Sequence, residues 1–193
     1  MRSLITLIMV LALVFAANTA WSNWHVDNEH SRLSFVSIKA DTIAEVHYFE
    51  TLRGVLEDDG QFELTIDLGS VETLIPIRNE RMREMLFNTS DYPHATLTAQ
   101  LNMQPIVDLA VGDQLEMNTE AQLDLVGQTS TLNVQTSVAR LGQNRLLVTS
   151  IQPLPLSANS LGLSAGVEQL RQVAGLPSIS PVVPATFRLT LTR

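Results

Sequence analysis

Histidine is the first residue type in this chain that could do chemistry, because its neutral ring is a common ligand for zinc. The four histidines are His25, His30, His47 and His94. His25 and His30 are five residues apart, which places them on opposite faces of a strand, and neither an HxH nor an HExxH spacing occurs. The pattern therefore predicts histidines in turns or at the edge of a core, and no metal site.

A serine in a glycine-rich stretch is the second candidate. Residues 162–166 read Gly-Leu-Ser-Ala-Gly, which matches the G-x-S-x-G nucleophile elbow with Ser164 as the nucleophile. That motif needs a strand before the serine, a helix after it and a histidine downstream, whereas the last histidine, His94, lies far upstream. A Gly/Ser-rich loop explains the motif better, so we expect no enzyme and no catalytic residue. A hydrolase that uses Ser164 stays as the third hypothesis.

Charged residues form one further cluster. Arg78, Arg81 and Arg83 lie beside Glu80 and Glu84 in a segment with helical spacing. Such a pattern is typical of a solvated helix face with local ion pairs. The sharper alternative is that Arg81 lies at the mouth of a cavity and contacts the polar head group of a ligand.

The elements that must position these residues are strands, with one helix among them. The stretch from Ile66 to Ala99 begins with alternating apolar and polar residues, and this alternation stops at Pro76. Helical spacing follows from Ile77 to Phe87, and Asn88 is the expected C′ residue. Since proline can open a helix but cannot continue a strand through a sheet, we predict one clear helix here.

Alternation elsewhere predicts about eight strands, at residues 32–40, 45–57, 61–68, 95–103, 114–126, 130–141, 145–158 and 185–193. Turn signals such as Asp59-Gly60 and Gly127 join neighbouring strands directly, so the pairing should be antiparallel. Residues 160–176 could form a short helix or a loop. The predicted fold class is all-β with one clear helix, an eight-stranded antiparallel up-and-down, lipocalin-like barrel.

The first 22 residues have the pattern of a secretory signal peptide. Arg2 supplies the positive start, Leu4 to Ala17 the apolar core, and Ala20 and Ser22 the small residues of a cleavage site. The apolar run of about 14 residues is shorter than the roughly 18 to 20 of a membrane span. We therefore predict cleavage after Ser22, one domain at residues 23–193, and a free product in the periplasm of a Gram-negative cell or outside the cell, with no membrane span.

The composition of the chain limits the classes of partner that the protein is expected to bind. The chain has no cysteine, so its fold does not depend on disulfides. Its net charge of −8 becomes −9 once Arg2 is removed, and its one lysine is Lys39. Nucleic acids and anionic lipids select basic surfaces, so we expect neither as a partner. Aliphatic residues dominate and aromatic residues make up 5%, which favours a flexible lipid tail over a flat ring as a ligand, although a filled barrel has the same composition.

Motifs along the predicted domain resemble the YceI-like family of exported, lipocalin-like barrels. The opening residues Trp24, Asp27, His30, Ser31 and Phe35 are similar to the family's W-x-x-D-x-x-H-S-x-x-x-F. Further similar positions follow in the family's order: Ser70-Val71-Glu72-Thr73, Asn79-x-Arg81, Met85, Phe87, Tyr92-Pro93-x-Ala95-Thr96, Leu123-x-Leu125-x-Gly127 and Leu132-x-Val134.

The resemblance implies a barrel whose interior binds a long isoprenoid, such as a polyprenyl or ubiquinone-type lipid, without catalysis and with no cofactor. It also implies a role in lipid or quinone transport, storage or stress response. Burial of an apolar chain at ~25 cal/mol per Å² would supply the binding energy. The alternative is a stress-related interaction protein whose barrel is filled and holds no ligand.

Apolar residues of the predicted strands and helix are the candidates for the cavity lining. They are Leu33, Phe35, Phe62, Leu64, Ile66, Met82, Met85, Leu86, Leu123, Leu125, Leu132 and Val134. The pattern alone leaves open which strand face points inward, and it leaves open the oligomeric state, a dimer included.

Overall fold

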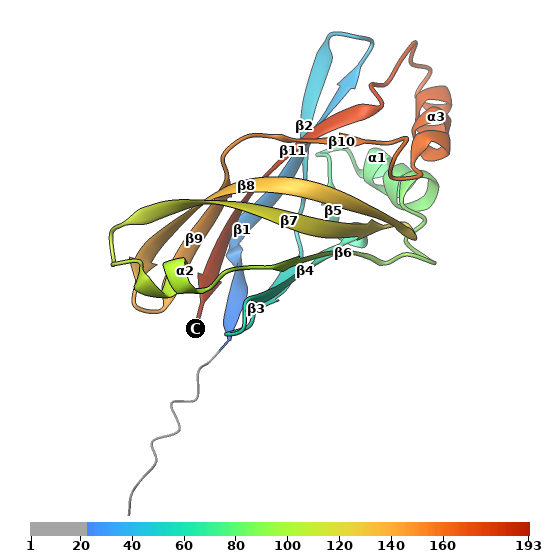
Figure 1. Cartoon of the computed structure of the whole chain (residues 1–193). Helices are drawn as coiled ribbons and strands as arrows, with labels where there is room; N and C mark the ends of the chain where they lie inside the picture. Colours follow the sequence, from blue (N-terminus) through green and yellow to red (C-terminus); the bar gives the residue numbers. More distant parts are fainter. Residues whose placement is uncertain (1–22) are drawn as a thin grey trace, which may run out of the picture.

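The computed structural model describes residues 23–193, and the predicted signal peptide at residues 1–22 lies outside the described part. Within that part, eight strands close a barrel (Figure 1). They are β1 (Trp24–Lys39), β3 (Leu52–Leu56), β4 (Gln61–Asp67), β6 (His94–Gln100), β7 (Gln114–Leu125), β8 (Gln128–Gly142), β9 (Arg145–Ser150) and β11 (Val182–Thr192). Each pairs antiparallel with its neighbours in chain order, and β11 pairs back onto β1, which confirms the predicted up-and-down barrel.

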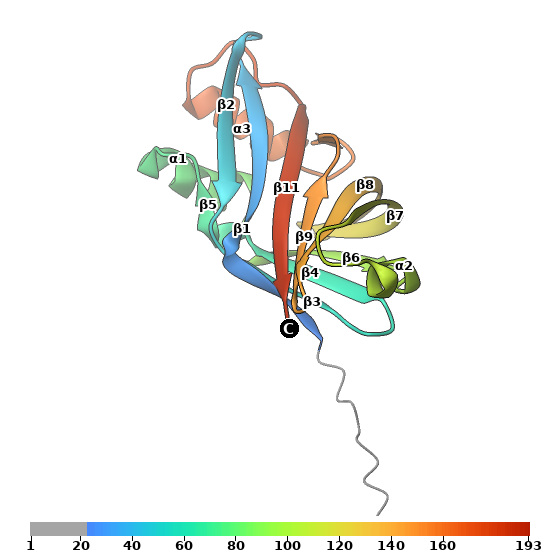
Figure 2. The same cartoon turned by 90° about the vertical axis from the view of Figure 1, so that its left-hand side faces the viewer.

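Two predicted strands each divide into two. The stretch 45–57 forms β2 (Ile43–Phe49) and β3, because the two ends of β1 have different partners. Residues 33–39 of β1 pair with β2, whereas Trp24 and His25 pair with β3. The β1–β2 hairpin therefore extends beyond one end of the barrel, where the short strand β5 (Val71–Glu72) pairs with β2 (Figures 1 and 2).

The stretch 145–158 divides for a similar reason. β9 ends at Ser150, and β10 (Leu154–Ser157) pairs with the opposite half of β11. Both divisions occur where one strand of the barrel wall, β1 or β11, pairs with two different strands along its length. Glu50-Thr51 and Pro153 interrupt the alternation at these two points, and they are the local signals of the change in partner.

The predicted helix at 77–87 is present as two consecutive short helical segments of different type. α1 (Pro76–Arg81) has Pro76 in its first turn, and a π-helical segment, η2 (Met82–Leu86), follows it directly. Asn88 follows with a φ of 46°, in the left-handed region that often ends a helix. A short 3-10 turn, η1 (Leu68–Ser70), joins β4 to β5.

Two further helices complete the described part. The ambiguous segment contains α3 (Ser164–Val173), and α2 (Gln104–Asp108) follows β6, which ends at Gln100 rather than at the predicted 103. η2 and α3 cover the end of the barrel from which the hairpin extends, and α2 covers the opposite end (Figure 1). Among residues 23–193, the helices are too short or too polar to cross a bilayer.

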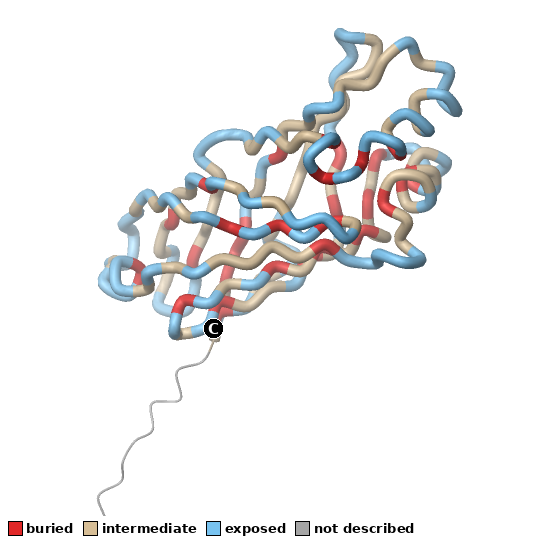
Figure 3. Tube along the Cα trace, turned by 45° about the vertical axis from the view of Figure 1, so that its right-hand side comes forward, coloured by how far each residue is buried: buried red, intermediate tan, exposed pale blue. Residues whose placement is uncertain are grey.

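Burial alternates along the strands (Figure 3), which shows that one face of each strand points into the barrel. In β7, Leu123 and Leu125 are buried while Gln122 and Asp124 are exposed. The end of the barrel near α2 is closed by Trp24, which is 1% exposed. The guanidinium of Arg193 lies 4.4 Å from the centroid of the Trp24 ring, so a cation–π contact covers it.

Candidate functional site

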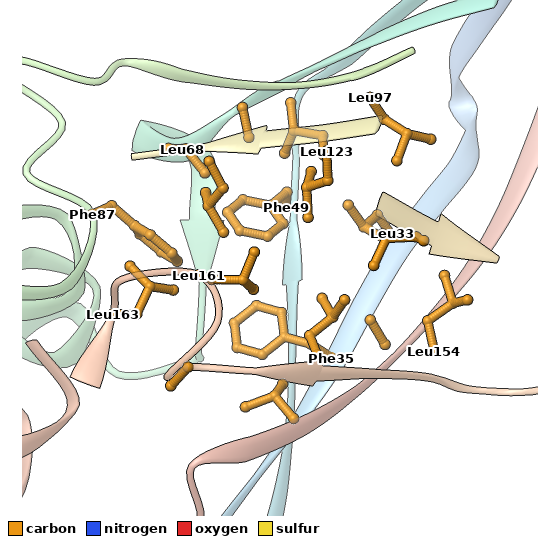
Figure 4. Close-up of a pocket in the computed structure, with 18 of the residues that line it drawn as sticks. Leu33, Phe35, Phe49, Leu68, Phe87, Leu97, Leu123, Leu154, Leu161 and Leu163 are labelled. Atoms are coloured by element: carbon orange, nitrogen blue, oxygen red, sulfur yellow. The ribbon is translucent and has the colours of Figure 1, made fainter. Parts of the chain in front are cut away.

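The barrel encloses an apolar cavity of about 170 Å³ below η2 and α3 (Figure 4). Within the described part of the chain, every side chain that lines the cavity belongs to a Leu, Ile, Val, Ala or Phe residue. They come from the barrel strands, from β2 and β10, and from the two helical covers. A cavity without hydrogen-bonding groups is a poor site for water and favours an apolar occupant.

A second cavity of about 80 Å³ continues the first toward α2. Leu64, Leu97, Val134 and Phe187 line both cavities. Because these residues come from β4, β6, β8 and β11, they form a constriction between the two cavities. The interior thus contains two apolar cavities in series with this constriction between them, an arrangement that suits a long and flexible ligand better than a compact one.

Ten of the twelve predicted lining residues lie around this path. Leu33, Phe35, Ile66, Leu86, Leu123, Leu125 and Leu132 line the larger cavity, Phe62 lines the smaller one, and Leu64 and Val134 line both. Inward orientation is settled for these residues, whereas their contact with a ligand stays a prediction.

Met82 and Met85 lie outside the linings that the described residues form. Met82 is buried in the core cluster that contains Phe87, and Met85 is half-buried on η2. The 3.6-residue period of an α-helix predicts both on the inward face. In η2 the amide of Phe87 instead donates to the carbonyl of Met82, five residues earlier, so the inward face rotates to Leu86.

In the larger cavity, the lining residues that sequence reasoning missed belong mainly to the covers and to strands outside the barrel wall. They include Phe49 on β2, Leu154 and Leu156 on β10, and Leu161 and Leu163 before α3. The spacing of Leu161, Leu163 and Val167 was the available signal. It was weak because the surrounding Gly and Ser residues suggested a loop.

The G-x-S-x-G motif has a structural role. Gly162 has a φ of 70°, and a β-carbon on Gly166 would lie 2.6 Å from the carbonyl oxygen of Met85. The hydroxyl of Ser164 donates to Oδ1 of Asn159 at 2.5 Å, at the start of α3. These contacts explain both glycines and the serine without a nucleophile. Among residues 23–193, no group of three or more His, Cys, Asp or Glu is placed to hold a metal ion.

A polar cluster lies on the inner face of the β1–β2 hairpin, beside the larger cavity. Glu45 Oε2 accepts from Lys39 Nζ at 2.8 Å and from Arg78 Nη1 at 2.6 Å. Nη2 of Arg78 donates to the carbonyl of Thr73 at 2.7 Å. The hydrogen bond from Lys39, together with the charge of Arg78, lowers the pKa of Glu45. Arg81, the predicted head-group contact, is the half-buried last residue of α1 and lies outside the cavity linings of the described chain.

His47 is the buried member of this cluster, with 2% of its surface exposed. Its Nε2 lies 2.8 Å from the hydroxyl of Ser37, and its ring meets the ring of Phe35 edge-on, with centroids 5.3 Å apart. Burial, assisted by the charge of Arg78, lowers the pKa of His47 to about 4, so the ring is neutral at neutral pH. The other three histidines are exposed, and His30 binds Asp27 at 2.8 Å.

Comparison with known proteins identifies relatives of this architecture. The sequence model of one protein family, described as the YceI-like domain, matches residues 24–191. A polyisoprenoid binding domain from Saccharophagus degradans, implicated in plant cell wall breakdown, is 38% identical. Its structure superposes with a TM-score of 0.86 over 88% of this chain and 97% of that one. A search of curated proteins found no match.

Two more distant structures share the fold. BcnA of Burkholderia cenocepacia has 19% identity and a TM-score of 0.67, over 86% of this chain and 98% of its own. A YceI protein of Campylobacter jejuni has 11% identity and a TM-score of 0.57, over 76% of this chain and 84% of its own. At these identities the likeness concerns the fold alone.

Proposed function

Because this chain belongs to the YceI-like domain family, we propose that it binds a long isoprenoid lipid inside its barrel and carries out no reaction on it. The observation that carries the proposal is the pair of apolar cavities that meet at the constriction of Leu64, Leu97, Val134 and Phe187. The 38% identical relative is described as a polyisoprenoid binding domain, which supports the same ligand class.

The physical chemistry of an isoprenoid chain fits this interior. Such a chain is apolar, linear and flexible, so it can follow a path that narrows once and widens again. Burial of about 500 Å² of its surface would provide on the order of 12 kcal/mol, before the cost of ordering the chain and the protein. The lining needs no polar group to reach that energy, and aliphatic side chains adapt to the methyl branches of the chain.

The alternative from sequence, a barrel filled by its own side chains, predicts no interior space beyond the size of one water molecule. A single water needs a cavity of about 10–15 Å³. The larger cavity, at about 170 Å³, exceeds that size by an order of magnitude. The described structure therefore favours the binding hypothesis over the filled barrel.

The proposal extends to the type of lipid and to its place in the cell. We propose a polyprenyl or ubiquinone-type ligand, held in the periplasm or outside the cell for transport, storage or stress response. The signal-peptide pattern of residues 1–22 supports the location. The apolar cavities support the ligand class.

Solvent extraction followed by mass spectrometry tests the proposal. Protein purified from its native cell envelope should release a prenyl lipid, and extracted protein should bind added ubiquinone or polyprenol of matched chain length. Repeated recovery of protein without lipid, together with no binding of either added lipid, would overturn the proposal. Straight-chain fatty acid of equal length serves as the competing ligand, and stronger binding of the fatty acid would also count against it.

A further inference from the structure

Four consecutive apolar residues, from Leu74 to Ile77, lie exposed where the chain leaves β5 and begins α1. Leu74 is 77% exposed, Ile75 is 42% exposed and Ile77 is 51% exposed. We call residues 74–77 the apolar loop. Single exposed apolar residues are normal on a protein surface, whereas a run of this length is uncommon in a soluble domain unless it binds something.

The backbone at Leu74 is strained. Its φ is 63°, in the left-handed region, which glycine and asparagine adopt more readily than leucine does. Either of those residues at position 74 would therefore suit the fold better. The side chain of Leu74 adds little packing in return, because most of its surface is exposed. These two facts indicate that the leucine side chain serves a contact outside the protein itself.

Hydrogen bonds to buried and half-buried side chains hold the apolar loop in place. Oδ1 of Asn79 accepts from the amide of Thr73 at 2.9 Å and from its hydroxyl at 2.5 Å, and both residues are buried. Nη2 of Arg78 donates to the carbonyl of Thr73 at 2.7 Å. The amide of Leu74 donates to the carboxylate of Glu72. The loop is thus fixed in its exposed position, so little conformational entropy is lost when it binds.

The apolar loop also lies beside an exposed part of β2. Glu72 pairs with Tyr48, and Nη1 of Arg78 binds Oε2 of Glu45 at 2.6 Å. The segment between these two contacts therefore follows residues 45–48 of β2. Val46, in the middle of that range, is 62% exposed. The exposed apolar surface thus continues from the loop onto the hairpin.

This surface is next to the covered end of the barrel. α1 leads directly into η2, and Leu86 of η2 lines the larger cavity. In Figure 2, α1 lies at the outer edge of the molecule, beside β5 and the β1–β2 hairpin. A partner that binds the apolar loop would therefore lie close to the cover of the cavity.

The size and the charge of this surface indicate the kind of partner. The apolar loop and Val46 are far fewer than the roughly 20–30 residues that a stable protein interface takes from each side. Insertion into the apolar layer of a bilayer needs no complementary partner surface, and its strength depends on the apolar area that is buried. The loop itself carries no charge, and the chain has a net charge of −8, so electrostatic attraction to anionic lipids is not expected.

We propose that the apolar loop inserts into the surface of an uncharged or zwitterionic lipid bilayer, and that this contact docks the covered end of the barrel for exchange of the isoprenoid with the membrane. The exchange rests on the proposed function, whereas the docking does not depend on it. Few side chains take part, so the docking is reversible.

Sedimentation with phosphatidylcholine vesicles that contain no isoprenoid tests the docking. The protein should sediment with these vesicles, and to the same extent at low and high salt. Leu74→Asn and Ile77→Ser should each lower the partition coefficient about tenfold. Val111→Asn is the matched control, because Val111 is 52% exposed in the turn after α2, at the opposite end of the barrel. It should sediment as the wild type does.

Leu74→Asn also separates docking from a role in the fold. Asparagine fits a left-handed backbone, so the free energy of unfolding of this variant should equal or exceed that of the wild type. A purely structural role for Leu74 predicts the opposite pattern, a less stable variant with unchanged vesicle binding. Urea denaturation beside the sedimentation assay distinguishes the two.

Fluorescence gives the orientation of the docked protein. Ile77→Trp and Val111→Trp each add one indole, at the covered end and at the α2 end respectively. Brominated phosphatidylcholine should quench the added indole of Ile77→Trp and leave that of Val111→Trp unquenched. Equal quenching of the two, or quenching of neither, would contradict docking through the apolar loop.

Three other results would overturn the docking proposal. One is a wild-type protein that stays in solution when the vesicles sediment. Another is binding only to vesicles that contain phosphatidylglycerol, which would mean that anionic lipid is recognised instead. The third is a wild-type dimer in sedimentation equilibrium that Leu74→Asn dissociates, because the loop would then bind a second copy of the chain.

Transfer of a fluorescent polyprenol to acceptor vesicles separates the docking from the proposed function. The transfer rate should rise with vesicle concentration for the wild type and be about tenfold lower for Leu74→Asn. A protein that binds vesicles but takes up no polyprenol would refute the proposed function and leave the docking in place. A protein that takes up polyprenol but binds no vesicles would do the reverse.

Discussion

Gly166 of α3 lies against Leu86 of η2 so closely that a β-carbon at position 166 would be 2.9 Å from the Cα of Leu86. This contact joins the two helices that cover the larger cavity, and Leu86 itself lines that cavity. The covers thus behave as one packed unit, and a glycine is what allows their backbones to approach. Opening of the barrel at this end requires the contact to separate.

Gly166→Val should force η2 and α3 apart, because its β-carbon would meet backbone atoms that a side-chain rotation cannot relieve. We expect a loss of about 1–3 kcal/mol in the free energy of unfolding and faster release of bound lipid. Urea denaturation and stopped-flow dissociation measure these quantities. Gly142→Ala is the control, since its nearest neighbour would be Cβ of Arg145 at 3.9 Å. Equal release rates in wild type and Gly166→Val would show that this contact does not limit opening.

Much of the barrel could be predicted because its strands alternate. Alternation puts Leu123 and Leu125 on one face of β7, and Leu132 and Val134 on one face of β8, as candidate lining residues, and all four line a cavity. Pro76 likewise marked the start of the helix. These features depend on residues near one another in the chain, so a local pattern is sufficient to find them.

The covers and the polar cluster could not be predicted in the same way. Glu45 of β2 and Arg78 of α1 come together only because the hairpin extends past the barrel and α1 packs beside it. The close contact at Gly166 joins segments about eighty residues apart in the sequence. Such features depend on pairings between distant segments, and alternation does not specify which pairing wins.

The constriction should set the length of the chain that the protein accepts. Val134→Phe would fill the narrow point between the two cavities, so long prenyl chains should bind about tenfold more weakly while short ones keep their affinity. Titration with ubiquinones of increasing chain length measures the effect. The overpacked side chain should also cost about 1–3 kcal/mol of stability.

Leu141→Phe controls for the size of the new side chain, because Leu141 is exposed on the same strand. It should leave the dependence on chain length as in the wild type. An unchanged length dependence in Val134→Phe would mean that ligands stay within the larger cavity. A uniform loss for short and long chains would indicate damage to the fold instead of a block at the constriction.

His47 should make the stability of the protein depend on pH in a defined window. Burial and the charge of Arg78 lower the pKa of His47 to about 4, below its ordinary value of 6.5. The unfolded chain therefore takes up the proton first as the pH falls, so the contribution of neutral His47 is complete above about pH 6.5 and is lost between 6.5 and 4. Between pH 7 and pH 5 this loss amounts to about 2 kcal/mol.

Urea denaturation of the wild type and of His47→Leu at pH 7, 6 and 5 isolates this effect. The carboxylates whose pKa values are lowered, Glu45 among them, titrate in both proteins, so the difference in slope belongs to His47. The variant should lose about 2 kcal/mol less than the wild type over this range. Parallel stability curves would show that the ring of His47 is more hydrated than its burial indicates.

The end of the barrel near α2 should depend on Arg140. Nη2 of Arg140 donates to the carbonyl of Ile106 at 2.8 Å, and the guanidinium lies 5.8 Å from the ring centroid of Trp24. Arg140→Met removes the hydrogen bond that holds α2 over the smaller cavity, and we expect a loss of about 1–3 kcal/mol in the free energy of unfolding.

Trp24 is the one tryptophan of the chain after Ser22, so its fluorescence reports this end alone. Its emission should shift to longer wavelength as water gains access, and Arg145→Met, at an exposed position on β9, should leave it unchanged. An unshifted emission together with wild-type stability in Arg140→Met would mean that the packing of Ile106, which is 2% exposed, is enough to close the barrel.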